Sequence, residues 1–230
     1  MPRRQVTAVE DRFLFRDRAD AGRQLADRVA MLDLQKPLVL ALPRGGVPVA
    51  VEIAQVLRAP LDLLLVRKLG LPWQPELAVG AVLDGDAPRM VINADIAQHA
   101  HMNEADIRRI AEAQLEEIAH RRRMWLDQRA HVPIEGRSAI LVDDGIATGA
   151  SVRAALDAVK ARKAARTVLA VPVVADFVAE ALRAACDEAV FLATPQDLAS
   201  VGMYYRDFHQ LRDDEVKRML SQAWDTLPAQ

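Results

Sequence analysis

The residues AILVDDGIATGAS, at positions 139–151, lead from an apolar run through two acids into a loop of small residues. The first four are apolar and rich in branched side chains, and the run is too short to cross a membrane, so it predicts a buried strand. Asp143 and Asp144 follow at its carboxyl end, the edge where open α/β sheets bind ligands. Adjacent side chains of a strand point to opposite faces, so the two carboxylates cannot both point the same way.

The rest of the stretch, residues 145–151, predicts a phosphate site. Its small residues allow backbone N–H groups to close around a phosphate, at the positive end of a helix that begins near Val152. Walker A and G-x-G-x-x-G patterns are absent from the stretch. A plain strand-turn-helix with an aspartate N-cap is the bland alternative, and a response-regulator acidic pocket would not require Thr-Gly-Ala-Ser. A phosphate cradle beside an acidic pair suits a sugar phosphate.

Taken together, the stretch closely resembles the 5-phosphoribosyl-1-diphosphate (PRPP) motif of the type I phosphoribosyltransferases. The resemblance implies their α/β fold: a mostly parallel sheet of about five strands flanked by helices, with a small hood and a flexible loop. It implies that Asp143 and Asp144 are catalytic, accept the ribose hydroxyls directly or through Mg²⁺, and favour a cationic sugar. The residues implied to bind the 5-phosphate are Ala147, Thr148, Gly149, Ala150 and Ser151.

A second motif follows the apolar run 37–42, which predicts another core strand. Two consecutive glycines after a buried strand mean that the backbone comes close to something or takes unusual angles. An ordinary strand-helix turn is the alternative. Beside the acidic motif, the loop resembles the family's diphosphate-binding loop, which implies a cis peptide between Pro43 and Arg44. The implied diphosphate ligands here are Arg44, Gly45 and Gly46.

A third expected strand, residues 61–66, ends in Arg67 and Lys68. Both cations would point toward the same carboxyl edge of the sheet as the two motifs, although both could simply be solvated. Lys68, with a Leu-Gly turn behind it, is the better candidate for a diphosphate contact.

Residues 71–102 form the least regular part of the pattern. An Asp-Gly pair at Asp84 between two apolar runs suggests a hairpin. Relatives carry a flexible loop here that closes over the reacting centre and excludes water. The segment 72–76, with its prolines and Trp73, is read equally well as part of such a lid or as fixed packing.

The remaining elements follow from hydrophobic periodicity and capping. A helix from Asp17 to Leu34 is expected with Asp20 as its N-cap, and a long helix from Asn103 to about Asp127 with Asn103 as its cap. Further helices are expected at 47–57, 152–163, 176–185 and 213–224, and strands at 12–16, 167–174 and 188–192.

The irregular segment 195–208 resembles the hood of 6-oxopurine phosphoribosyltransferases, a match that depends on spacing. It implies base-contacting roles for Tyr204, Tyr205 and Asp207. The whole pattern also resembles an uncharacterised family of predicted phosphoribosyltransferases, which share the Pro-Arg-Gly-Gly, Arg-Lys-Leu-Gly, Asp-Asp-Gly-Ile-Ala-Thr-Gly and Tyr-Tyr-x-Asp-Phe motifs. The expected organisation is one domain, with a core at about 37–192, a hood from about 1–36 and 193–212, and a C-terminal helix at about 213–224.

Composition narrows the class of protein. The length of 230 residues suits one α/β domain, and a net charge of −2 gives no nucleic-acid field. The single Cys186 excludes an internal disulfide and reads as a helix-packing residue, while His99 and His101 read as part of a polar loop. Without a signal peptide or an apolar run of spanning length, the expected location is cytoplasmic, with no membrane partner.

The implied reaction transfers the 5-phosphoribosyl group of PRPP to a nitrogenous acceptor, such as a nucleobase, with Mg²⁺ as cofactor and release of diphosphate. This places the protein in nucleotide and nucleoside metabolism, as a homo-oligomer, a dimer by expectation. Ala147 stands where the hypoxanthine-guanine branch has an aspartate, so a standard enzyme of that branch is not expected. A PRPP- or nucleotide-binding regulator and a hydrolase of phosphoribosyl compounds are the alternatives.

Overall fold

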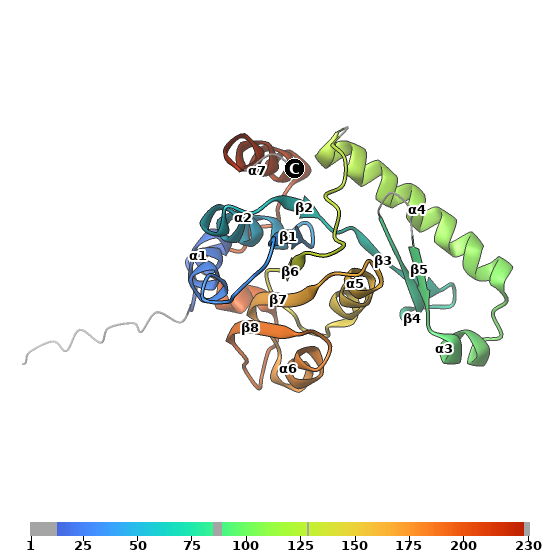
Figure 1. Cartoon of the computed structure of the whole chain (residues 1–230). Helices are drawn as coiled ribbons and strands as arrows, with labels where there is room; N and C mark the ends of the chain where they lie inside the picture. The colour runs from blue at the N-terminus through green and yellow to red at the C-terminus, as the bar shows by residue number, and fades with distance from the viewer. Residues whose placement is uncertain (1–12, 85–88, 128, 228–230) are drawn as a thin grey trace, which may run out of the picture.

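The computed structural model describes residues 13–84, 89–127 and 129–227. Its centre is a parallel sheet in the order β2-β1-β6-β7-β8 (Figure 1). The expected fold class, an α/β fold with a mostly parallel sheet of about five strands, is confirmed. The five strands are β1 (Leu38–Ala41), β2 (Leu61–Leu63), β6 (Ser138–Val142), β7 (Arg166–Val173) and β8 (Glu188–Ala193).

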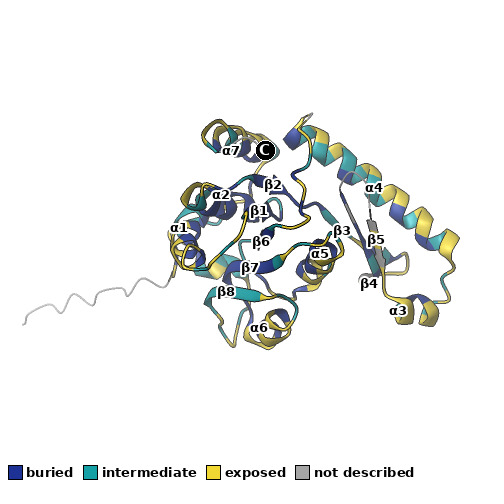
Figure 2. Cartoon of the chain, viewed as in Figure 1, coloured by how far each residue is buried: buried dark blue, intermediate teal, exposed yellow. Residues whose placement is uncertain are grey.

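Side chains of the central strands alternate between two hydrophobic layers, as the period of a strand requires. Val39 and Ile140 pack with the helices α1 (Arg18–Val29) and α2 (Gly46–Leu57) on one face. Leu40 and Leu141 pack with α5 (Ala150–Ala161) and α6 (Asp176–Arg183) on the other. Figure 2 shows the result, with largely dark blue central strands and a teal β8 between helices whose outer faces are yellow. The helix α7 (Asp213–Thr226) lies beside α2.

A second, antiparallel sheet projects from this core and was not predicted as such. It has the order β3-β4-β5 and is bordered by α3 (Ala94–His99) and the long α4 (Glu104–Leu126) (Figure 1). We call this part, residues 66–126, the arm. Its strands are β3 (Val66–Leu71), β4 (Gln74–Leu83) and β5 (Arg89–Ile92).

The arm corrects two expectations. The strand expected at 61–66 stops at Leu63, because the chain then leaves the core sheet and pairs with β4 from Val66 onward. Residues 71–102 are also more regular than expected: antiparallel pairing of β4 with β5 confirms the hairpin, although its turn at 85–88 lies outside the described residues. Trp73, at the β3–β4 turn, is 65% exposed.

Helix caps follow the chemistry of the preceding residue. The N-cap of α1 is Asp17, whose carboxylate accepts the backbone N–H of Asp20, so the expected cap at Asp20 is wrong by one turn. Asn103 caps α4 as expected. The strand expected at 12–16 is only a bridge between Phe15 and Tyr205, with residue 12 outside the described part. Within the described part of the chain, every helix is too short or too polar to cross a bilayer.

Candidate functional site

The acidic pair lies at the carboxyl end of β6, at the centre of the sheet. Asp143 and Asp144 are both half-buried, and Asp143 Oδ1 accepts the backbone N–H of Asp144 at 2.9 Å. Burial raises the pKa of Asp143 well above its ordinary value, and the neighbouring carboxylate of Asp144 raises it further. Burial also raises the pKa of Asp144, but the guanidinium of Arg18 opposes that shift.

Arg18 contacts the acidic pair directly, and the sequence did not identify it. Its Nε donates to Asp144 Oδ2 at 2.7 Å, and the side chain comes from the first turn of α1. The residue is only 8% exposed. A signal was available in the sequence: Arg18 is spaced three and seven residues before Ala21 and Leu25, on the buried stripe of α1. A cation on an apolar stripe requires a buried partner.

The double glycine of the second motif packs directly against the acidic pair. A Cβ on Gly45 would lie 2.2 Å from Asp144 Oδ2, and one on Gly46 would lie 2.4 Å from the carbonyl oxygen of Val142. Only glycine permits such an approach. The peptide between Pro43 and Arg44 is cis, as expected. The two motifs therefore meet at one edge of the sheet.

The third part of the site is the loop between β6 and α5. Ile146 ties it to the sheet, because its N–H donates to the carbonyl of Val173 at 2.9 Å. Gly149 has a φ of +76°, a left-handed conformation that favours glycine, and it turns the chain into the first turn of α5. The first N–H groups of a helix lack intrahelical acceptors, so this loop suits an anion. The exposed residues at this turn are Ala147, Thr148, Ala150 and Ser151.

Two cavities flank the acidic pair. The first, of about 200 Å³, lies on the side of Asp143, and the second, of about 530 Å³, lies on the side of Asp144. Arg121, from α4 of the arm, borders both. The first cavity also contacts Pro43, Arg67 and Ser151 among others. The second is lined by Arg18, Arg44, Gly45, Arg121, Asp144, Val201, Phe208, Gln210 and Leu211.

Arg67, rather than Lys68, lines the first cavity together with Asp143. Lys68 is exposed on β3. Arg67 donates to Glu117 at 3.0 Å, and the Nε of Arg121 donates to the same Glu117 oxygen at 2.6 Å. The buried Nε of Arg67 has no hydrogen-bond partner among the described residues. These two guanidinium groups hold the pKa of Glu117 below its ordinary value, chiefly through the hydrogen bond from Arg121.

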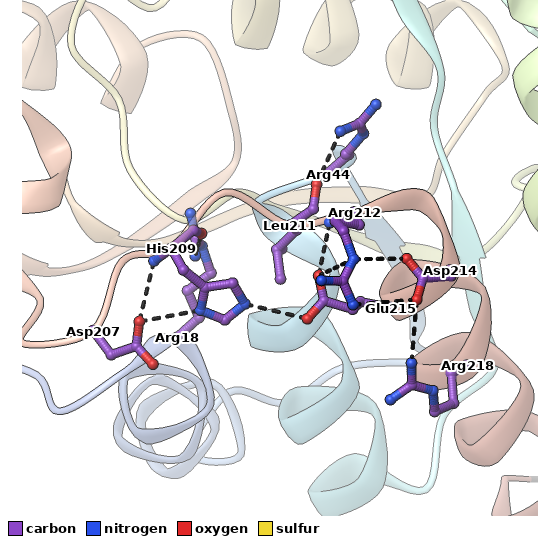
Figure 3. A network of polar contacts seen from close by, with 9 residues as sticks. All are labelled: Arg18, Arg44, Asp207, His209, Leu211, Arg212, Asp214, Glu215 and Arg218. Carbon is purple, nitrogen blue, oxygen red and sulfur yellow. Dashed lines mark hydrogen bonds and ion pairs between the residues drawn. The ribbon is translucent and has the colours of Figure 1, made fainter.

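Arg44 borders the second cavity but already has a carboxylate partner. Its Nε lies 3.0 Å from an oxygen of Asp213, at the start of α7, and its Nη1 donates to the carbonyl of Leu211 at 2.9 Å. Trp125 donates its indole N–H to the same Asp213 at 3.0 Å. Figure 3 shows Arg44 above a polar network that continues along the segment 207–218. Arg44 thus links the double-glycine loop to the C-terminal helix.

The three residues expected to contact a base are placed differently from one another. The ring of Tyr205 is 2% exposed, and its hydroxyl donates to the carbonyl of Asp144 at 2.6 Å. Tyr204 is half-exposed, and Asp207 accepts hydrogen bonds from His209 (Figure 3). The residues of segment 195–208 that line the second cavity are Val201 and Phe208, not the three expected ones. Phe208 stacks on Tyr205 with ring centroids 4.9 Å apart.

The donor set at the site fits Mg²⁺ only as an ion shared with a substrate. Within residues 13–84, 89–127 and 129–227, no three or more histidine, cysteine or acidic side chains gather to hold a metal. Asp143 and Asp144 are adjacent, and one of the two is already paired with Arg18. Mg²⁺ is commonly held by one or two carboxylates together with phosphate oxygens and water, so two carboxylates suffice if the substrate supplies the rest.

The parallel sheet carries an acidic pair and a double glycine at its carboxyl edge, beside a turn of small residues at the start of α5, and this is the architecture of a phosphoribosyltransferase. A family model described as the phosphoribosyl transferase domain matches residues 16–204, and the chain belongs to this family. The recognition made from the motifs at 43–46 and 139–151 is therefore confirmed.

Among individual proteins, the chain is similar to two from Mycobacterium tuberculosis, strains CDC 1551 / Oshkosh and ATCC 25618 / H37Rv. They are named "Putative phosphoribosyl transferase MT0597" and "Putative phosphoribosyl transferase Rv0571c", and each is 47% identical over 210 residues. The alignment covers 91% of this chain and 47% of each relative, so the chain spans about half the length of the curated relatives it matches.

The fold is also that of a solved structure, the crystal structure of the protein TT1426 from Thermus thermophilus. The two chains are 42% identical, and the match has a TM-score of 0.82. It covers 90% of this chain and 98% of the other.

Proposed function

We propose that the protein transfers the 5-phosphoribosyl group of PRPP to a nitrogenous acceptor, with release of diphosphate. The observation that carries this proposal is the meeting of three motifs at one sheet edge, where Gly45 abuts the carboxylate of Asp144 and Ser151 borders the same cavity as Asp143. Family membership supports the same chemistry.

In this reaction the bond between C1 of the ribose and the diphosphate oxygen breaks, and a bond from C1 to an acceptor nitrogen forms. The acceptor nitrogen loses a proton, and the leaving diphosphate takes up negative charge. The backbone of residues 147–151 and the hydroxyls of Thr148 and Ser151 would hold the 5-phosphate at the start of α5. Holding the sugar at this fixed end aligns C1 with its partners.

The acidic pair would act on the sugar ring. Asp143 and Asp144 can accept the ribose hydroxyls, and their negative charge favours the positive charge that develops at C1. Bound Mg²⁺ would supply charge neutralisation to the diphosphate oxygens, with Asp143 and Asp144 as its protein ligands, directly or through water. Both carboxylates are half-buried, so water screens their charges less than at the surface.

Positive groups around the pair would stabilise the leaving group. Arg44, Gly45 and Gly46 are the expected diphosphate ligands, and Arg67 is better placed than Lys68 to join them, because it borders the cavity beside Asp143. Its buried Nε, unpartnered among the described residues, supports this assignment. Val201 and Phe208, which line the second cavity, are better placed for acceptor contacts than the expected Tyr204, Tyr205 and Asp207.

The decisive experiment incubates the protein with PRPP, Mg²⁺ and a panel of nucleobases and amines, and measures diphosphate release. Release that depends on one acceptor supports the transferase. Release that is independent of every acceptor identifies water as the acceptor and a hydrolase. Tight PRPP binding without release across the panel would reject catalysis in favour of a PRPP-binding regulator. Cytoplasmic location and a homodimeric state remain predictions of the sequence.

A further inference from the structure

The side chain of Arg18 has the environment of a fixed group rather than of a solvated cation. Besides its 2.7 Å hydrogen bond to Asp144, it donates through Nη1 to the carbonyl of His209 at 3.0 Å. The centre of its guanidinium lies 3.8 Å from the centroid of the Phe208 ring. Three different contacts hold one planar group, so Arg18 has little freedom to leave Asp144.

The neighbours of Arg18 come from parts of the chain that are far apart. Arg18 and Asp144 are separated by 126 residues, and Arg18 and His209 by 191. The same segment of the chain donates the Tyr205 hydroxyl to the Asp144 backbone at 2.6 Å. Asp144 is therefore held twice, at its backbone by Tyr205 and at its carboxylate by Arg18.

Asp143 and Asp144 have unequal surroundings as a consequence. Asp144 has a buried cation at hydrogen-bond distance and borders the cavity with Val201 and Phe208. Asp143 borders the other cavity with Ser151. The charged or titratable side chains around Asp144 are Arg18, Asp143 and Tyr205, with Arg44 and Arg121 lining the same cavity.

We propose that Arg18 is a positioning residue for the transfer reaction: it fixes the carboxylate of Asp144 and takes up part of its charge, which leaves Asp143, in the cavity with Ser151, as the carboxylate on the 5-phosphate side of the site. This inference rests on the proposed function. It assigns different roles to two acids that the sequence pattern treats alike. It also means that α1 contributes a residue to the site through Arg18, although α1 lies outside both proposed phosphate-binding loops.

The test compares kcat and KM for PRPP in wild type, R18Q, R18K, D144N and the double variant R18Q/D144N. R18Q leaves both phosphate-binding loops intact, so KM for PRPP should stay within about threefold while kcat falls by about 10²-fold, the cost of a misplaced reacting group. R18K keeps the charge but not the planar fork, so it should recover part of kcat. The double variant should be no slower than the slower single variant, because R18Q and D144N each remove the same contact between residues 18 and 144.

The matched control is R23Q, a change on the same helix. Arg23 is exposed and pairs with Glu52 at 3.2 Å rather than with Asp144. It should leave kcat and KM unchanged. A rise in KM with an unchanged kcat in R18Q, or additive losses in the double variant, would overturn the positioning role. If R18Q does not fold, the comparison of R18K with wild type carries the same decision.

A structural measurement separates this inference from the transferase itself. Crystal structures of wild type and of R18Q or R18K show whether the Asp144 carboxylate turns when its partner changes, whatever the protein catalyses. A carboxylate that keeps its wild-type orientation in R18Q overturns the proposal. Absence of turnover in wild type rejects the transferase, and the orientation of Asp144 then decides the role of Arg18 alone.

Discussion

The hydroxyl of Tyr205 donates to the backbone carbonyl of Asp144 at 2.6 Å, across 61 residues of sequence. This contact ties the C-terminal segment to the loop that follows β6. Phe15 and Phe208 enclose the same ring, with centroid distances of 5.2 and 4.9 Å. The ring of Tyr205 and its hydroxyl can be tested separately, because the ring packs between two phenylalanines and the hydroxyl bonds to the Asp144 carbonyl.

Tyr205→Phe should remove the hydrogen bond and keep the packing. The carbonyl of Asp144 would lose its donor, which costs about 1–3 kcal/mol when the group is buried. We expect this loss in the free energy of unfolding, measured by urea denaturation. Tyr204→Phe, at a half-exposed position, is the control and should change stability little. Equal stability of the two variants would mean that the contact contributes nothing net.

Asp143→Asn should depress kcat far more than it weakens PRPP binding. The variant keeps the shape of the side chain and removes a negative charge that, in the proposed reaction, acts on the reacting sugar. Loss of one well-placed electrostatic contact costs about 10²–10³ in rate. Steady-state kinetics and calorimetric PRPP binding measure the two quantities. Asp157→Asn, exposed on α5, is the control; a loss of affinity as large as the loss of rate would contradict the assigned role.

Asp143→Asn should lower kcat but raise the free energy of unfolding at neutral pH. Burial and the neighbouring carboxylate raise the pKa of Asp143 in the folded protein. Between its ordinary and its raised pKa, the folded state therefore binds more protons than the unfolded state. The free energy of unfolding then rises as pH falls through this window, and above it the buried charge destabilises the fold.

Asp143→Asn should accordingly be more stable than wild type at neutral pH, and the difference should shrink as pH falls. Urea unfolding of both proteins at several pH values measures this, without PRPP or Mg²⁺. A wild type that loses stability relative to the variant on acidification would reverse the sign and contradict the shift.

Thr148→Ala and Ser151→Ala should weaken PRPP binding while sparing turnover at saturation. Each removes a hydroxyl from the loop at the start of α5, and a hydrogen bond of this kind is worth about 0.5–1.5 kcal/mol. Affinity should therefore fall by roughly twofold to twelvefold per variant. Ribose 5-phosphate serves as a second ligand, because it carries the same phosphate without the diphosphate. Unchanged affinity for both ligands would mean that the 5-phosphate binds somewhere other than this loop.

Gly45→Ala should abolish most activity, because its Cβ would overlap the Asp144 carboxylate. Either the loop or the acid has to move, and a shift of about 1 Å at the reacting groups costs about 10² in rate. Gly136→Ala is the matched control: its φ of +72° makes alanine strained, but no described residue lies within 4 Å of the added carbon. The control should lose stability and keep its kcat.

The sequence predicted the core sheet well because its strands are buried on both faces. Apolar runs such as 38–41 and 139–142 are typical of buried strands, and the acids and glycines after them mark the edge where ligands bind. The arm was harder to predict, because alternating and irregular apolar residues at 71–92 are compatible with a lid or a sheet. Pairing between β3 and β4 depends on partners that local patterns do not identify.

The site was predicted in part for a related reason. Residues in contiguous motifs, such as Asp143 and Gly45, are identified by their spacing. Arg18 and Arg67 are not, because their roles depend on which distant segment faces them. Lys68 and Arg67 are neighbours in sequence, and only the alternation of β3 decides which one lines the cavity on the side of Asp143.

The parallel pairing of β1 with β6 joins Leu38 to Ala139, with the whole arm between them. Closing so large a loop costs conformational entropy before the central strands can pair, and chains with such topologies fold slowly. Contacts within the arm are local by comparison, since β3, β4 and β5 follow one another along the chain. The arm can therefore organise first and shorten the effective distance between the two central strands, which gives it a part in assembly as well as in the finished site.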